Sequence, residues 1–184
     1  MKDIIIMLGP QGSGKSTQAK LLAKKYNYID IIESNILRKE AKKKTKLGKE
    51  IKTKMSKGIL VPFEVTCDLL FKKINLTKKN KIIIDGFPRE IEQAHVLDYF
   101  IYSNKHKLVD VIYVDVPKNI CVKRMLLRKR DDDKPNIIKK RLEIYFKETK
   151  PLINYYKKRL IKINGARNTN EVFKEINKKI KSRV

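Results

Sequence analysis

Five short runs of apolar residues are spread along the chain, and within each run the apolar residues are largely consecutive. Such runs are typical of strands buried on both faces, as in a parallel sheet, whereas strands with one face in water alternate apolar and polar residues. The pattern therefore predicts five parallel strands, at residues 3–8, 28–32, 81–85, 110–116 and 160–163.

Between these runs the apolar residues recur at spacings of three or four, which predicts amphipathic helices. Leu22, Ala23 and Tyr26 follow the first run in this way, and Val172 and Ile176 follow the last. Regular alternation of strands and helices predicts an α/β fold with right-handed crossovers.

One region departs from this alternation. Residues 33–62 are helical in pattern and basic, and they are interrupted by Gly48, Gly58 and Pro62. We interpret them as an inserted helical region within one domain, because a length of 184 residues suits a single domain, here 1–184.

The net charge is +25, from 45 Lys and Arg against 20 Asp and Glu. A nucleic-acid partner is one explanation. The other is compositional: lysine outnumbers arginine 36 to 9, and Lys, Asn and Ile share A/T-rich codons. We favour the compositional explanation because nucleic-acid readers often use arginine for bidentate contacts.

The location of the protein can also be predicted. The two cysteines cannot form a disulfide framework, no apolar run approaches the roughly 18 residues of a membrane span, and the start lacks the shape of a signal peptide. We expect a cytoplasmic protein with no membrane partner.

A phosphate-binding motif follows the first predicted strand. Residues 9–17 read Gly-Pro-Gln-Gly-Ser-Gly-Lys-Ser-Thr and match the pattern G-x-x-x-x-G-K-[ST] between a buried strand and a helix. Glycines let backbone N–H groups converge on phosphate oxygens, Lys15 neutralises the β/γ-phosphates, and the Ser16 hydroxyl can ligate Mg²⁺. The motif predicts a nucleoside triphosphate site.

A second motif, Asp85-Gly86-Phe87-Pro88-Arg89, follows the third predicted strand. Asp85 is placed where an acid can approach Mg²⁺, in part through water, or it is a turn residue before glycine. Gln93, four residues after Arg89, is of a type that can contact an adenine edge, or it is an ordinary helix residue.

Together these motifs resemble the adenylate kinase family of nucleoside monophosphate kinases. Further segments in the same order resemble that family, among them Leu37-Arg38, residues 58–62, Glu92-Gln93-Ala94, residues 149–156 and Gly165-Ala166-Arg167. The resemblance implies the three-layer sandwich of a P-loop NTPase, with a five-stranded parallel sheet of order 2-3-1-4-5 and helices on both faces.

The resemblance also implies the site residues. The implied ATP site consists of Gly9, Gln11, Gly12, Ser13, Gly14, Lys15, Ser16, Thr17, Arg124, Arg128 and Arg167. The implied AMP site consists of Glu33, Ser34, Arg38, Gly58, Leu60, Val61, Gly86, Arg89, Gln93, Arg130 and Arg141. The catalytic residues would be Lys15, Arg89, Arg124, Arg130 and Arg141, and Ser16 and Asp85 would hold Mg²⁺.

Three segments depart from the family pattern, one of them at Phe63, where the family usually has Asp. Glu33-Ser34-Asn35 stands where the family usually has Thr-Gly-Asp, which places a carboxylate at the acceptor pocket. The lid between the arginine clusters is reduced to a stub at residues 128–132, with no cysteine cluster that could hold zinc.

The expected activity is reversible, Mg²⁺-dependent transfer of the ATP γ-phosphoryl group to AMP, giving two ADP. The alternatives are a UMP/CMP or broad-specificity monophosphate kinase and, from a different class, a nucleic-acid-stimulated P-loop ATPase. The absence of Trp and of RNA-binding strings argues against the last of these, so we expect nucleotides as partners, no specific nucleic acid, and a monomer.

Overall fold

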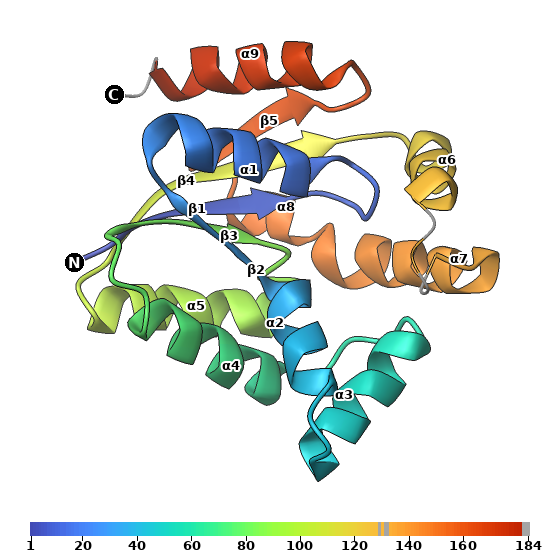
Figure 1. Ribbon diagram of the computed structural model, residues 1–184. Coiled ribbons are helices and arrows are strands. Elements are labelled where there is room, and N and C mark those ends of the chain that lie inside the picture. The colour runs from blue at the N-terminus through green and yellow to red at the C-terminus, as the bar shows by residue number, and fades with distance from the viewer. Residues whose placement is uncertain (129, 131–132, 182–184) are drawn as a thin grey trace.

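The computed structural model describes residues 1–128, 130 and 133–181, which build a five-stranded parallel sheet between layers of helices (Figure 1). The strand order β2-β3-β1-β4-β5 confirms the predicted order, and all neighbours are parallel. The strands are β1 (Asp3–Leu8), β2 (Ile29–Ile32), β3 (Lys81–Asp85), β4 (Lys107–Asp115) and β5 (Leu160–Asn164).

The start of β4 differs from the prediction, because the strand begins at Lys107 and not at residue 110. Lys107 pairs with Asp3 in the register of β1, and its N–H donates to the carbonyl oxygen of Lys2 at 2.8 Å. Backbone pairing therefore extends the strand beyond its apolar core. The other strands agree with the predicted runs to within one residue at each end.

The side chains of β1 alternate between two hydrophobic cores. Ile4, Ile6 and Leu8 pack on the face covered by α4 (Phe63–Asn75), α5 (Ile91–Ser103) and α8 (Leu152–Tyr155). Ile5 and Met7 pack on the opposite face, under α1 (Lys15–Tyr26), α6 (Lys118–Arg128) and α9 (Thr169–Lys181). Since successive strand residues point to opposite faces, the continuous apolar runs are explained, and the three-layer sandwich is confirmed.

The predicted helical insertion consists of α2 (Glu33–Ala41) and α3 (Lys46–Ser56), which project from one side of the sheet (Figure 1). They share a small apolar cluster in which Leu37, Ile51 and Val61 are buried. The insertion therefore has a core of its own. This core holds the start of α2 beside the carboxyl ends of the strands.

The chain after α6 contains the predicted lid stub, of which residues 129 and 131–132 lie outside the described part. α7 (Pro135–Ile144) then begins, and from Tyr145 to Thr149 it widens into a π-helical turn. Such turns are rare and occur often at functional sites. Here the turn buries Thr149 beside the segment that carries Arg89.

Candidate active site

The phosphate-binding loop joins the end of β1 to α1, so that Lys15 is the first residue of the helix. The N–H of Ser13 donates to the carbonyl oxygen of Pro10 at 3.1 Å and closes the loop. Gly12 has φ +84°, and a Cβ there would lie 2.5 Å from the carbonyl oxygen of Cys121 on α6. Only glycine therefore fits where the loop touches α6, and the loop directs the positive end of α1 toward anions.

A cavity of about 550 Å³ opens at the carboxyl ends of the strands, where parallel α/β sheets bind their ligands. It brings together most of the predicted site. From the predicted ATP site it is lined by Gln11, Gly12, Ser13, Gly14, Lys15, Ser16, Thr17, Arg124, Arg128 and Arg167. From the predicted AMP site it is lined by Glu33, Ser34, Arg38, Gly58, Leu60, Val61, Gly86, Arg89, Arg130 and Arg141, and Asp85 lines it too.

Two predicted site residues are not among the described residues that line this cavity. Gly9 directly follows β1, and Gln93 is buried on α5 with its side-chain amide facing Arg89 and Glu90. Their ligand contacts stay predictions.

Asp85, at the end of β3, lies next to Ser16 of the loop. The Ser16 hydroxyl donates to Oδ2 of Asp85, and Asp85 is 1% exposed. Its other oxygen, Oδ1, is buried and has no hydrogen-bond partner within the described part of the chain. A hydroxyl beside an unsatisfied buried carboxylate oxygen fits Mg²⁺, which prefers hard oxygen ligands.

Lys15 is half-buried beside this pair, and its ammonium group donates to the carbonyl oxygen of Pro10 at 3.2 Å. Burial lowers the pKa of Lys15 from its ordinary value, and the Asp85 carboxylate opposes this effect. The charged form is therefore poorly solvated when no anion is present. A phosphate in the loop would supply the missing counter-charge.

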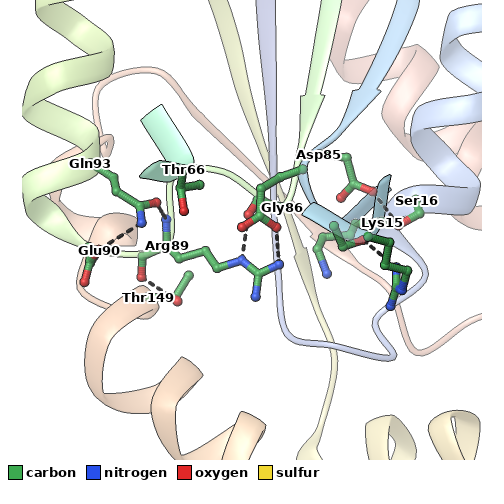
Figure 2. A network of polar contacts seen from close by, with 12 residues as sticks. Lys15, Ser16, Thr66, Asp85, Gly86, Arg89, Glu90, Gln93 and Thr149 are labelled. Atoms are coloured by element: carbon green, nitrogen blue, oxygen red, sulfur yellow. Dashed lines mark hydrogen bonds and ion pairs between the residues drawn. The ribbon is translucent and has the colours of Figure 1, made fainter. Parts of the chain in front are cut away.

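Arg89 is held at several points, as Figure 2 shows. Its backbone N–H donates to Oε1 of Gln93 at 2.9 Å, and its carbonyl oxygen accepts from the Thr149 hydroxyl at 2.7 Å. In its side chain, Nε donates to the carbonyl oxygen of Gly86 at 2.8 Å, and Nη2 forms an ion pair with Glu33. Both the backbone and the guanidinium of Arg89 are therefore positioned by the protein.

On the opposite side of the cavity, Arg124 of α6 is bound to a backbone turn. Its guanidinium donates to the carbonyl oxygens of Gly165 at 2.9 Å and Ala166 at 3.3 Å. These residues follow β5 and belong to the loop that the resemblance assigns to the ATP base. Arg124 thus connects that loop to α6, the helix that packs on Gly12.

Arg128, at the end of α6, forms a two-bond ion pair with Asp133. Nε and Nη2 of Arg128 donate to the two carboxylate oxygens at 2.9 and 2.7 Å, and Asp133 is 8% exposed. The backbone N–H of Arg130 donates to the same carboxylate at 3.2 Å. This carboxylate therefore holds the side chain of Arg128 in a bidentate geometry that favours Arg over Lys, and it holds Arg130 through its backbone.

On the insertion side, Arg38 of α2 donates through Nη1 to the Ser34 hydroxyl at 3.1 Å, one turn earlier. Gly58 follows α3 and lies against α7, where a Cβ would be 3.0 Å from Cγ2 of Ile137. These contacts place the insertion and α7 on one rim of the cavity.

Several contributing residues were not among the site residues predicted from the sequence. Met55, Ile59 and Asn168 also line the cavity. Thr149 does not line it but supports Arg89 from behind. Its position depends on the π-helical turn, for which residue spacing gives no signal.

Comparisons with known proteins show the family of the chain. The family model of adenylate kinase matches residues 7–161. The chain belongs to the adenylate kinase family. Adenylate kinase of Clostridium tetani is 36% identical, and the match covers 94% of this chain and 95% of that protein. Adenylate kinase of Prochlorococcus marinus strain MIT 9515 is 42% identical, and the match covers 85% of this chain and 86% of that protein. This confirms the resemblance and the enzyme class, a nucleoside monophosphate kinase.

The comparisons also bear on the length of this adenylate kinase family member. The match to the Clostridium tetani protein extends over 207 aligned positions, more than the 184 residues of this chain. That relative therefore carries residues without a counterpart here. Among the described residues, no group of three or more His, Cys, Asp or Glu is placed to hold a metal ion, and no helix is long and apolar enough to cross a membrane.

Proposed function

We propose that this enzyme transfers the γ-phosphoryl group of Mg²⁺-bound ATP to AMP, reversibly, and yields two ADP. The observation that carries the proposal is the convergence of cationic side chains from five separate segments on one cavity. These are Lys15, Arg38, Arg89, Arg124, Arg128, Arg130 and Arg141. A triphosphate that faces a monophosphate needs such a set, because the reaction is catalysed by positioning and charge stabilisation.

The cavity has two sides, and we assign one nucleotide to each. The loop, Lys15 and Arg124 form the side for ATP, where backbone N–H groups at the start of α1 bind phosphate oxygens. Arg38, Arg89 and residues 58–61 form the side for AMP. The γ-phosphoryl group then passes between them, near Lys15 and the arginines of α6 and α7.

The acceptor needs no general base. Its nucleophile is a phosphate oxygen, which is already ionised at neutral pH. The two histidines, His95 and His106, do not line the cavity. Arginine stays charged at any working pH and binds phosphate through two parallel N–H groups. These side chains can therefore stabilise the negative charge on the phosphoryl group as it passes from donor to acceptor.

Ser16 and Asp85 would hold the magnesium ion, Asp85 in part through water. When bound, the ion would neutralise part of the phosphate charge. The chain contributes the burial of Asp85 and its position at the end of β3, next to Ser16 of the loop.

A parallel acceptor assay tests the proposal. ATP and Mg²⁺ are supplied with AMP, CMP, UMP or GMP, and a reaction without acceptor is run beside them. We expect AMP to be the preferred acceptor. Preference for CMP or UMP would assign the enzyme to the pyrimidine class, and transfer to none of the four would overturn the proposal.

A variant then tests the residue roles. Arg89→Ala should lower kcat by roughly 10³-fold or more, as expected for loss of one stabilising arginine. Arg159→Ala is a matched control, because Arg159 lies outside this cavity and donates to the carbonyl oxygen of Leu108. Near-normal turnover in a folded Arg89→Ala enzyme would contradict the assigned role.

The same proposal includes the setting in which the enzyme acts. We expect a monomer in the cytoplasm, because the cavity already contains donor and acceptor groups from one chain and both cysteines are free and buried. Size-exclusion chromatography with light scattering checks the first point. We expect no specific nucleic-acid partner for the positive charge, and RNA-stimulated turnover would contradict this.

A further inference from the structure

Glu33 lies where the chain leaves β2 and enters α2. Parallel register pairs Ile32 with Asp85, so the residues that follow, Glu33 and Gly86, leave the sheet side by side. Glu33 is 4% exposed and lines the cavity on the acceptor side. A buried carboxylate in a cavity built for anions needs an explanation, since the charge is costly to bury and repels phosphate.

The explanation lies in how the Arg89 guanidinium is used. One edge of the fork, formed by Nε and Nη2, is occupied by the carbonyl oxygen of Gly86 and the carboxylate of Glu33. The third nitrogen, Nη1, has no hydrogen-bond partner among the described residues. In Figure 2 one terminal nitrogen of Arg89 points away from these contacts. Arg89 therefore has an edge still able to bind phosphate.

An arginine side chain has several rotatable bonds, and without these contacts the fork could turn among many orientations. Two acceptors on one edge select a single orientation. The same residue is already fixed at its backbone by Gln93 and Thr149. The Glu33 carboxylate completes this support at the guanidinium end of the Arg89 side chain.

We propose that Glu33 is a positioning residue for the acceptor phosphate, which holds one edge of the Arg89 guanidinium so that its other edge meets the phosphate. The inference rests on the proposed function for its acceptor. Burial raises the pKa of Glu33. The Arg89 guanidinium opposes this effect most and Lys15 opposes it less, whereas the Asp85 carboxylate adds to it. The ion pair with Arg89 therefore supplies the main local counter-charge for the Glu33 carboxylate.

The test measures binding of AMP without ATP by calorimetry, so that turnover is not required. Glu33→Ala should weaken AMP binding by about 10- to 100-fold, a scale typical of a misplaced contact group. Glu33→Gln should recover most of the loss, because its amide oxygen can still accept from Nη2. Glu40→Gln is the matched control: Glu40 lies on the same helix and pairs with Lys43 outside the cavity.

A double-mutant cycle separates action through Arg89 from direct contact with the ligand. In the Arg89→Ala background, Glu33→Ala should have little further effect on the Kd for AMP. If the full effect persists there, Glu33 touches the ligand itself and positioning is wrong. If Glu33→Ala tightens AMP binding, the carboxylate masks Arg89, which also overturns the proposal.

Steady-state kinetics add a measurement that a purely structural role would not produce. Glu33→Ala should raise the KM for AMP while the KM for ATP stays within about twofold of wild type, as for loss of one acceptor contact. Equal loss for both substrates would indicate a damaged scaffold. If the acceptor assay favours another monophosphate, the proposed function fails separately, and the same cycle is measured with that acceptor.

Discussion

The side chain of Gln93 accepts a hydrogen bond from the backbone N–H of Arg89 at 2.9 Å. Gln93 is 1% exposed, and its amide nitrogen donates to Oε1 of Glu90 at 2.8 Å. Both ends of the amide are therefore used within the protein. Any contact with adenine, as predicted from the sequence, would have to use the second N–H of the amide or the second lone pair of its oxygen.

Replacing Gln93 should destabilise the protein. Gln93→Leu leaves the N–H of Arg89 without its acceptor, and an unsatisfied buried donor costs about 1–3 kcal/mol. Urea unfolding should show a lower midpoint with an unchanged slope. Glu92→Gln, at an exposed neighbouring position, is the control. Equal stability of Gln93→Leu and wild type would show that the N–H finds another partner.

The same variant tests base selection. If Gln93 reads adenine, kcat/KM should fall more for AMP than for CMP in Gln93→Leu, since adenine loses a bidentate partner. Equal losses for both acceptors would restrict Gln93 to its role in holding Arg89.

The loop geometry predicts a difference between two glycine substitutions. Gly12 and Gly14 both have positive φ, +84° and +89°. A Cβ at Gly12 would lie 2.5 Å from a carbonyl oxygen, whereas a Cβ at Gly14 meets nothing within 4 Å. Gly14→Ala should therefore cost only the backbone strain, about 1–2 kcal/mol, and Gly12→Ala should cost more and abolish ATP binding. Thermal unfolding and ATP titration measure both, and the reverse ranking would contradict the loop structure.

Much of the fold and site was predictable because it depends on local patterns. Continuous apolar runs identified each strand, and the glycines around Lys15 identified the loop. The strand order came from the family resemblance, which the sheet confirms. The exact bounds of the helices leave no such pattern in the sequence. The same is true of a strand end that backbone pairing sets, as at Lys107.

The support of Arg89 was not predictable, for a physical reason. Glu33 and Thr149 are 56 and 60 positions away from it in the sequence, and they meet it only through sheet register and a π-helical turn. Glu33 was visible as a departure from the family pattern, but its ion pair was not. Long-range contacts between polar side chains leave no periodicity in the chain.

The two thiols should be unreactive in the folded protein. Burial raises the pKa of both Cys67 and Cys121 to about 11. At neutral pH the thiolate fraction is then roughly a hundredfold below that of an ordinary cysteine. A thiol-reactive dye should label the native protein slowly, faster as pH rises toward 11, and quickly in urea. Rapid labelling of native protein at neutral pH would contradict this burial.

The charge of the insertion should act at a distance. Residues 33–62 carry ten basic and three acidic residues beside the acceptor side of the cavity. A positive field raises the rate at which anionic nucleotides arrive, and salt screens it over about 10 Å at 0.1 M. We expect kcat/KM for AMP to fall as salt rises while kcat changes little. Charge reversal at exposed Lys44 and Lys49 should flatten this dependence, and an unchanged slope would exclude steering by the insertion.

The short connection after α6 should make ATP hydrolysis without AMP measurable. Arg128 and Asp133 form a two-bond ion pair, and only four residues separate them in the sequence. Lids in such enzymes exclude water from the phosphates. With so short a connection water should reach the γ-phosphate, and other nucleoside triphosphates should replace ATP more readily. Phosphate release without acceptor measures the first effect, and Lys15→Ala shows the background from contaminants. Hydrolysis no faster than that background, in an enzyme with full AMP kinase activity, would mean that the cavity excludes water without a lid.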